Sequence, residues 1–395
     1  MCERKKRTNG SAAHLYFIWT TVLTFVAAGC GDDPTFTNSI GSQLVTTGVT
    51  IRDTTIEAIG SSTFKQPLAM NGSVNLVGRY EGYLAYTAIQ FALPRRDTIL
   101  ILSAELRLRA VSWFGDSSAR FRFDAHKISR GWSPATLQWD SVGAGFFESA
   151  IAGTFDGSVA ADTQQIALSL TDTALVRQWF LESAVPSYGI ILVPDLQSTN
   201  VVRGMYAFGG DSVSYYPTLV IDALSLNGKR DTMQYNTGID TFVGNVDNLT
   251  SDMQLIYLQS GVVYRSTVRF DLSFIPPGAI VNTAQMLLER QPVATRLTKV
   301  TVDTVVAAHA LISPTDSTRF DVPILGRRLG GTANTFQFEA RRAAQLWVNG
   351  MNYGILLRAT PQSEFNSFDR YTFYNQNAPD SLRPRLKIVY TVEKN

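Results

Sequence analysis

The sequence predicts an all-β protein with two tandem β-sandwiches, each of which carries one short helix. Three observations lead to this prediction. Apolar and polar residues alternate over many short segments, the second half repeats motifs of the first half in the same order, and each half has one segment with helical spacing. Frequent turn residues between the alternating segments are typical of an all-β sandwich.

Apolar residues recur at every second position in three segments of the first half. Side chains alternate in this way when one face of a strand lies in the core and the other lies in water. The apolar positions are Ile89, Phe91 and Leu93; Ala104, Leu106, Leu108 and Ala110; and Phe121, Phe123 and Ala125.

The second half of the chain repeats the first. The matched positions include Phe91 and Phe270, His126 and His309, and Trp179 and Trp347. The period of about 165 to 185 residues makes each copy a whole domain rather than a unit of a solenoid. We therefore expect β-sandwich domains at residues 46–224 and 231–393, with the polar segment 225–231 as their boundary.

One segment in each half has apolar residues at helical spacing, on one face of a short helix. We expect each helix to close one end of its sandwich, with its tryptophan in the core. These residues are Leu175, Val176, Trp179 and Phe180 after Asp172, and Ala343, Leu346 and Trp347 after Ala340.

Residues 1–29 have the three parts of a secretory signal peptide. Basic residues from Arg4 to Arg7 precede an apolar run that begins at Leu15, and small residues end the segment. The apolar run is shorter than the roughly 20 residues that span a membrane comfortably. Residues 27–30, Ala-Ala-Gly-Cys, resemble the lipobox of bacterial lipoproteins, which implies a lipid anchor at Cys30. An ordinary signal peptide with an accidental cysteine is the alternative.

Cysteine content and charge restrict the class of the mature chain. Cys30 is its one cysteine, so no intramolecular disulfide can form. The whole chain has a formal charge of +2, and the signal contributes +3, which leaves the mature chain at −1. A chain this close to neutral does not favour nucleic acid as a partner. Residues 30–45 are rich in polar and small residues and predict a flexible tether.

The segment from Thr267 to Glu289 resembles the signature of the DNRLRE family of secreted bacterial modules, in which an Arg-Phe-Asp-Leu strand leads through an Ile-Pro turn into a Thr/Ser-Ala strand. The segment from Trp132 to Trp139 resembles the family's Trp…Thr…Trp segment, and residues 347–354 and 383–386 resemble its closing part. The resemblance covers most of both halves through short motifs. It implies jelly-roll-like β-sandwiches and kinship with carbohydrate-binding modules, which include alginate binders.

Each half departs from the family pattern at one place. The first half has Gln-Phe-Ala at residues 90–92 where Arg-Phe-Asp is expected, and the second half lacks the Trp…Thr…Trp segment. The family's ligand therefore cannot be assumed for either half. The stretch from Ile40 through Asp53 to Gly78 resembles, more weakly, a lipoprotein family of unknown function, which implies the same localisation and no activity.

The sequence predicts no catalytic residues, no metal site and no cofactor. It has no His-Glu-x-x-His, paired Cys-x-x-Cys, Gly-x-Ser-x-Gly or phosphate-binding glycine-rich motif. His126 and His309 occupy matching positions, which a repeated strand position explains better than a duplicated ligand contact. A glycosidase needs only two carboxyl groups at a suitable separation, so that class stays open.

The candidate ligand-binding residues are Trp113, Trp132 and Trp139. Exposed aromatic rings can pack against the apolar C–H faces of sugars. In the alternative interpretation, Trp132 and Trp139 pack against the edge of the sandwich, as large aromatic residues usually do. The second half has no aromatic residue at the matching place, residues 313–317. We therefore expect any glycan affinity mainly in residues 46–224.

Together these patterns predict a non-catalytic lipoprotein at the outer membrane or cell surface, which displays two β-sandwich modules for glycan binding or adhesion. The expected partners are the membrane through the lipid anchor, polysaccharide, and other envelope proteins. One alternative is a structural or protein-binding subunit of a surface assembly. A glycan-cleaving enzyme is the other.

Overall fold

A computed structural model describes residues 48–393, except positions 97, 160, 161, 182–186, 211, 248–251, 300, 302–304, 331 and 332. The signal at 1–29, the tether at 30–45 and Cys30 lie outside the described residues. Residues 52–390 form one compact unit. Its secondary structure is mainly β-strand, arranged in antiparallel sheets, which confirms the all-β prediction.

Strands make up most of the described chain, with short α-helices between them. The strands of the first 250 residues are β1 (Val49–Lys65), β2 (Val74–Tyr80), β3 (Tyr83–Gln90), β4 (Ile99–Gly115), β5 (Phe121–Ile128), β6 (Phe147–Gly157), β7 (Gln165–Leu170), β8 (Ile190–Pro194), β9 (Val201–Tyr206), β10 (Thr218–Ser225), β11 (Arg230–Asn236) and β12 (Ile239–Val246). The later strands are β13 (Leu255–Gln259), β14 (Tyr264–Phe270), β15 (Ile280–Glu289), β16 (Val305–Ala310), β17 (Ile324–Arg328), β18 (Thr335–Glu339), β19 (Ile355–Arg358), β20 (Arg370–Tyr374) and β21 (Arg385–Glu393). The α-helices are α3 (Thr173–Phe180), α4 (Arg341–Val348) and α5 (Pro361–Glu364).

The first sheet is an open half-barrel. Its strand order is β11-β10-β4-β9-β2-β3-β8-β5-β6, with β12 paired to β3 and β7 paired to β4. Its core is formed by the alternating apolar residues that the sequence pattern identified, including Leu106, Phe121 and Phe123, each with no exposed surface. The period-two pattern therefore predicted which side of these strands is buried.

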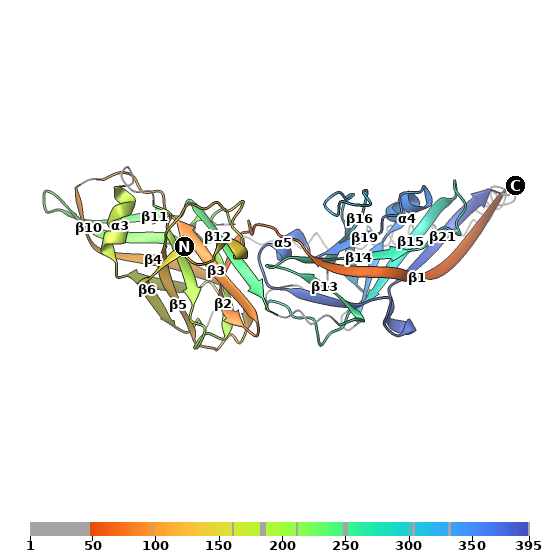
Figure 1. Ribbon diagram of the computed structural model, residues 1–395, viewed down its shortest axis with the longest axis horizontal. Coiled ribbons are helices and arrows are strands. Elements are labelled where there is room, and N and C mark those ends of the chain that lie inside the picture. Colours follow the sequence, from red (N-terminus) through yellow and green to blue (C-terminus); the bar gives the residue numbers. More distant parts are fainter. Residues whose placement is uncertain are drawn as a thin grey trace, which may run out of the picture. The chain divides into compact units, whose positions relative to one another are not determined.

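The second sheet closes into a barrel. Its strand order is β1-β21-β15-β18-β17-β16-β19-β14-β13-β20, and an additional pairing of β1 with β14 completes the ring. The pairing runs from Ala58 opposite Phe270 to Lys65 opposite Tyr264, and Figure 1 shows β1 beside β14 and β21. Closure satisfies backbone groups that an open edge would leave free.

The sheets exchange strands across the expected domain boundary. β1, from the expected first domain, belongs to the second sheet, whereas β11 and β12 from the expected second domain belong to the first. The segment 225–231 is the turn of the β10–β11 hairpin, in which the Ser225 N–H donates to the Lys229 carbonyl at 3.0 Å and Gly228 has φ +73°. Polar turn residues occur in hairpins as well as in linkers, so composition alone does not distinguish the two.

Both predicted helices are present. In α3, the Asp172 side chain caps the helix by accepting a hydrogen bond from the Leu175 N–H at 3.1 Å, and Trp179 is buried. In α4, Trp347 is buried in the same way. An apolar face at helical spacing identified both segments, and a capping carboxylate marks the start of α3 alone.

The aromatic pairs beside the two helices have nearly the same geometry. The rings of Phe91 and Trp179 are 5.9 Å apart at 30°, and those of Phe270 and Trp347 are 6.2 Å apart at 29°. The histidines also match, since His126 contacts Phe147 and His309 contacts Phe320. The matched positions thus have similar aromatic neighbours in the two sheets, although His309 is buried and His126 is only half-buried.

The barrel contains a buried group of charged side chains. Glu364 has no exposed surface and receives two hydrogen bonds from Arg265, at 3.0 and 3.1 Å, and a further one from Arg358. Both arginines are less than 10% exposed. A buried carboxylate with two guanidinium partners keeps all three groups hydrogen-bonded away from water.

Candidate functional site

The first sheet has two chemically different faces. Residues alternate between the faces along each strand, so Ile89 and Leu192 lie in the core whereas Ala88 and Ile191 belong to a separate cluster on the other side. Ala88 and Ile191 lie opposite each other on β3 and β8. We call this second side the outer face.

Two of the predicted ligand-binding tryptophans cover part of the outer face. Trp132 and Trp139 lie in the segment between β5 and β6, and both are half-buried. The Trp139 ring lies 5.0 Å from the Tyr86 ring at 51°, and the Trp132 Nε1–H donates to the Tyr188 carbonyl at 2.8 Å. We call these residues the aromatic cluster; its partly buried members are Tyr86, Trp132, Trp139, Val142, Phe147, Tyr188 and Val193.

Trp113 does not join this cluster. It is a half-buried residue of β4 that packs against the main core of the first sheet. The guanidinium of Arg203, which is only 2% exposed, lies 5.8 Å from the Trp113 ring centre. The three tryptophans named from the sequence thus divide into a pair on the outer face and one core residue.

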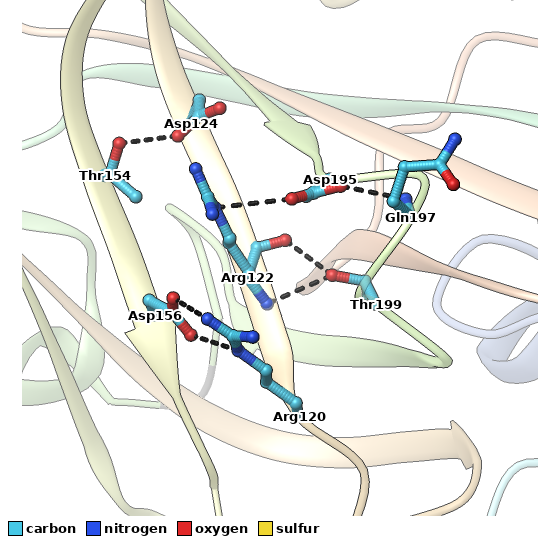
Figure 2. Close-up of polar contacts among 8 residues, drawn as sticks. All are labelled: Arg120, Arg122, Asp124, Thr154, Asp156, Asp195, Gln197 and Thr199. Atoms are coloured by element: carbon cyan, nitrogen blue, oxygen red, sulfur yellow. Dashed lines mark hydrogen bonds and ion pairs between the residues drawn. The ribbon is translucent and has the colours of Figure 1, made fainter.

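A strip of paired polar side chains lies on β5 and its neighbours (Figure 2). Arg120 forms an ion pair with Asp156 on β6, and the Arg122 Nε lies 3.4 Å from an Asp195 oxygen. The Thr154 hydroxyl donates to Asp124 at 2.6 Å. We call these residues the polar strip.

The turn after β8 holds one end of the polar strip in place. The Gln197 N–H donates to Asp195 at 2.8 Å, and the Thr199 hydroxyl both donates to the Arg122 carbonyl at 2.6 Å and accepts from the Arg122 N–H at 3.0 Å (Figure 2). A side chain with several fixed partners keeps one orientation before any ligand arrives. The polar strip is therefore pre-organised.

The polar strip and the aromatic cluster meet on the outer face. Asp124 of the strip lies directly opposite Val193, which packs in the aromatic cluster. Residues directly opposite on neighbouring antiparallel strands project to the same side. The two groups together make one surface with half-buried rings beside fixed hydrogen-bonding groups.

Two carboxyl groups of the polar strip, those of Asp156 and Asp195, have lowered pKa values. The hydrogen bond from Arg120 lowers the pKa of Asp156, and the backbone hydrogen bond from Gln197 lowers the pKa of Asp195. A general acid for glycosidic bond cleavage needs a raised pKa. The strip also carries three aspartates against two arginines, so it has no surplus positive charge for a polyanion.

Asp240 on β12 is a carboxyl group with a raised pKa, on the other side of the sheet. It lies opposite the core residue Ile89, and desolvation by burial raises its pKa to about 6 although the Phe208 N–H donates to it at 2.9 Å. It therefore does not supply an acid to the outer face.

We expect Asp240→Asn to stabilise the protein above pH 6. The folded carboxyl binds its proton more tightly than an unfolded one, with pKa values of about 6 and 3.8, so the wild type loses stability as pH rises through this interval. The difference corresponds to on the order of 3 kcal/mol, and asparagine avoids it while still accepting from Phe208. Urea unfolding at pH 4 and pH 7 measures the effect; equal stabilities of the two proteins at pH 7 would contradict it.

Sequence reasoning missed Tyr86, Arg122 and Asp195 as members of this face. The turn-forming residues after Pro194 indicate a loop, but nothing local indicates that the loop returns to β5. Among the described residues there is no group of three or more side chains that could hold a metal ion. No helix in the described part of the chain has the length and apolar character to cross a membrane.

Comparisons with known proteins add little to this geometry. No family model and no curated protein matches the chain. The structure of the Macrobrachium rosenbergii nodavirus is 8% identical, over 87% of this chain and 90% of that one, with a TM-score of 0.15. The infectious bursal disease virus Gx strain is 9% identical, over 88% and 80%, with a TM-score of 0.13. TM-scores this low support no statement about function.

Proposed function

We propose that this chain is a non-catalytic lipoprotein of the bacterial cell envelope that binds glycan on the outer face of its first sheet. The observation that carries the proposal is the junction of the aromatic cluster with the polar strip. A sugar offers apolar C–H faces to half-buried rings and hydroxyl groups to fixed donors and acceptors. The lowered pKa values of Asp156 and Asp195 support binding rather than acid catalysis.

We also propose that the two sheets are duplicated jelly-roll-like modules that have exchanged edge strands. Support comes from the matched aromatic pairs, the matched histidines and the helix in each half. A glycine with positive φ also precedes the matching strand in each half, Gly189 at +82° and Gly354 at +93°. A Cβ there would lie 2.0 Å from the Ile89 carbonyl or 2.9 Å from the Val268 carbonyl, so both positions need glycine.

The glycan proposal predicts weaker binding when the outer face is altered. Trp139→Ala and Arg122→Ala should each lower the affinity for an oligosaccharide selected on a glycan array by about tenfold or more, since a central aromatic ring or a fixed polar contact dominates such sites. Isothermal titration measures the affinity. Phe208→Ala, at a 47% exposed ring outside the aromatic cluster, is the control and should bind like wild type. An array without any bound glycan would favour the structural alternative.

The anchor proposal concerns Cys30. Two or more acyl chains bind a membrane stably, at about 0.8 kcal/mol per buried CH₂. We expect the wild type, expressed with its signal, to enter the detergent phase on Triton X-114 partitioning and Cys30→Ser to stay in the aqueous phase. Equal partitioning of the two proteins would show that no lipid is attached at Cys30.

A further inference from the structure

A groove lies in the wall of the barrel, where β1 passes β13. Its lining comes from residues 61–65 of β1, residues 252 and 253 before β13, residues 255–257 of β13, residues 375–377 after β20, and Tyr264. Its volume is about 440 Å³. This lies within the range of roughly 300–1,000 Å³ that is usual for small-ligand sites.

The groove follows from the way that β13 leaves the barrel wall. β1 pairs with β14 along the whole length of β14, but β13 pairs with β14 only at Gln259 opposite Tyr264 and otherwise pairs with β20. The Tyr257 N–H donates to the Thr63 hydroxyl at 3.2 Å, which ties β13 to β1 at one point. On the side of Asp252, no strand pairing between described residues links the two segments, and the groove occupies this space.

The lining is rich in uncharged hydroxyl and amide groups. Ser61 donates to the Gln376 side-chain oxygen at 2.5 Å, which leaves the Gln376 amide nitrogen without a hydrogen bond to the described residues. The Asn377 Nδ2 donates to the Met253 carbonyl at 2.9 Å, so this amide is oriented as well. Hydroxyl and amide groups provide both donors and acceptors for hydroxyl-rich ligands.

Two further features restrict the ligand. The groove has one cation, Lys65, and one anion, Asp252, so its net charge is zero. Tyr264 adds a half-buried aromatic ring to the lining, whereas Tyr257, which also lines the groove, is only 9% exposed. A balanced charge, oriented amides and an aromatic surface match a neutral saccharide better than an acidic one.

We infer that this groove is a second saccharide site, which binds a neutral oligosaccharide. For the class of ligand, the inference rests on the proposed function of the outer face. Two sites in one chain would let a single polysaccharide strand be held at two places, which raises the overall affinity without any new contact. The second half of the chain would then contribute its own contacts, although it lacks the tryptophans of the first.

The test compares variants of the two sites by isothermal titration and thermal melting. The probes are cellohexaose and mannohexaose, with hexamannuronate as the acidic comparison. The groove variant is Gln376→Ala with Asn377→Ala, the outer-face variant is Trp139→Ala, and Asn282→Ala is a control at an exposed amide outside the groove lining. We expect at least one neutral hexasaccharide to bind Trp139→Ala. For the same hexasaccharide, the groove variant should show one site with at least tenfold lower affinity than in the wild type.

Other results would overturn the inference in distinguishable ways. If the groove variant binds every probe like wild type while Trp139→Ala loses binding, the groove inference fails and the proposed function stands. If the groove holds hexamannuronate and neither neutral probe, the assignment of a neutral ligand fails. If no hexasaccharide binds the wild type, the groove inference fails, whereas the proposed function of the outer face fails only if the glycan array is empty as well. Unchanged melting temperatures show that each variant is folded.

Discussion

Replacing Phe91 or Phe270 by alanine is expected to lower the free energy of unfolding by about 3–5 kcal/mol. Both side chains are at most 2% exposed, and each ring lies against a buried tryptophan beside a helix. Removal of the ring leaves a cavity that the surrounding strands can fill only in part. Urea unfolding followed by circular dichroism and tryptophan fluorescence measures the loss.

A third phenylalanine provides the matched control. Phe274 is 46% exposed, and its ring lies 6.4 Å from that of Tyr390, so Phe274→Ala should change stability by about 1 kcal/mol or less. Hydrogen exchange adds the location of the effect: Phe91→Ala should reduce protection in β3 and β8, and Phe270→Ala in β14 and β19. If all three variants lose the same small amount of unfolding free energy, Phe91 and Phe270 do not occupy equivalent core positions.

Glu364→Ala is expected to cost a similar amount, about 3–5 kcal/mol, for an electrostatic reason. The substitution leaves Arg265 and Arg358 buried, close to each other and without their shared carboxylate. Water cannot reach these two buried positive charges to replace the interaction with the carboxylate that they lose. Chemical denaturation at pH 7 measures the change.

Two comparisons separate charge from shape at this position. Glu364→Gln keeps the volume and one acceptor oxygen, so any loss of stability that it shares with Glu364→Ala comes from the missing charge and the one missing acceptor. Asp156→Ala breaks an ion pair whose arginine is 56% exposed. Because water can solvate this arginine, the stability should stay close to that of wild type. If Glu364→Ala lowers the free energy of unfolding no more than Asp156→Ala does, burial does not make the Glu364 group more important for stability.

Features that depend on neighbouring residues could be predicted from the sequence. The alternation through Phe121 and Phe123 identified the buried side of β5, and the spacing of Leu175 and Trp179 after Asp172 identified α3. The order of the repeated motifs predicted that Phe91 and Phe270 occupy equivalent positions, as do Trp179 and Trp347. These signals are local because side-chain periodicity and helix capping depend on positions a few residues apart.

Strand exchange could not be predicted in this way. The segment 225–231 has the composition of a linker and of a hairpin turn, and only its hydrogen bonds show that it joins β10 to β11. The residues of β1 are exposed or half-buried, with only Ala58 buried among its 17 residues, so its pattern does not indicate which sheet it joins. Its place is decided by pairing with the backbone of β14, about 200 residues later in the sequence.

The sequence by itself determined the strand-rich class, the two helices, the repeated aromatic core and the two tryptophans between β5 and β6. The tertiary structure alone decided that Trp139 meets Tyr86, that Arg122 meets Asp195, and that β1 closes the barrel and forms one wall of the groove. Each of these contacts joins residues more than 50 positions apart. Such contacts depend on the register and pairing of whole strands, and no local pattern of side chains encodes them.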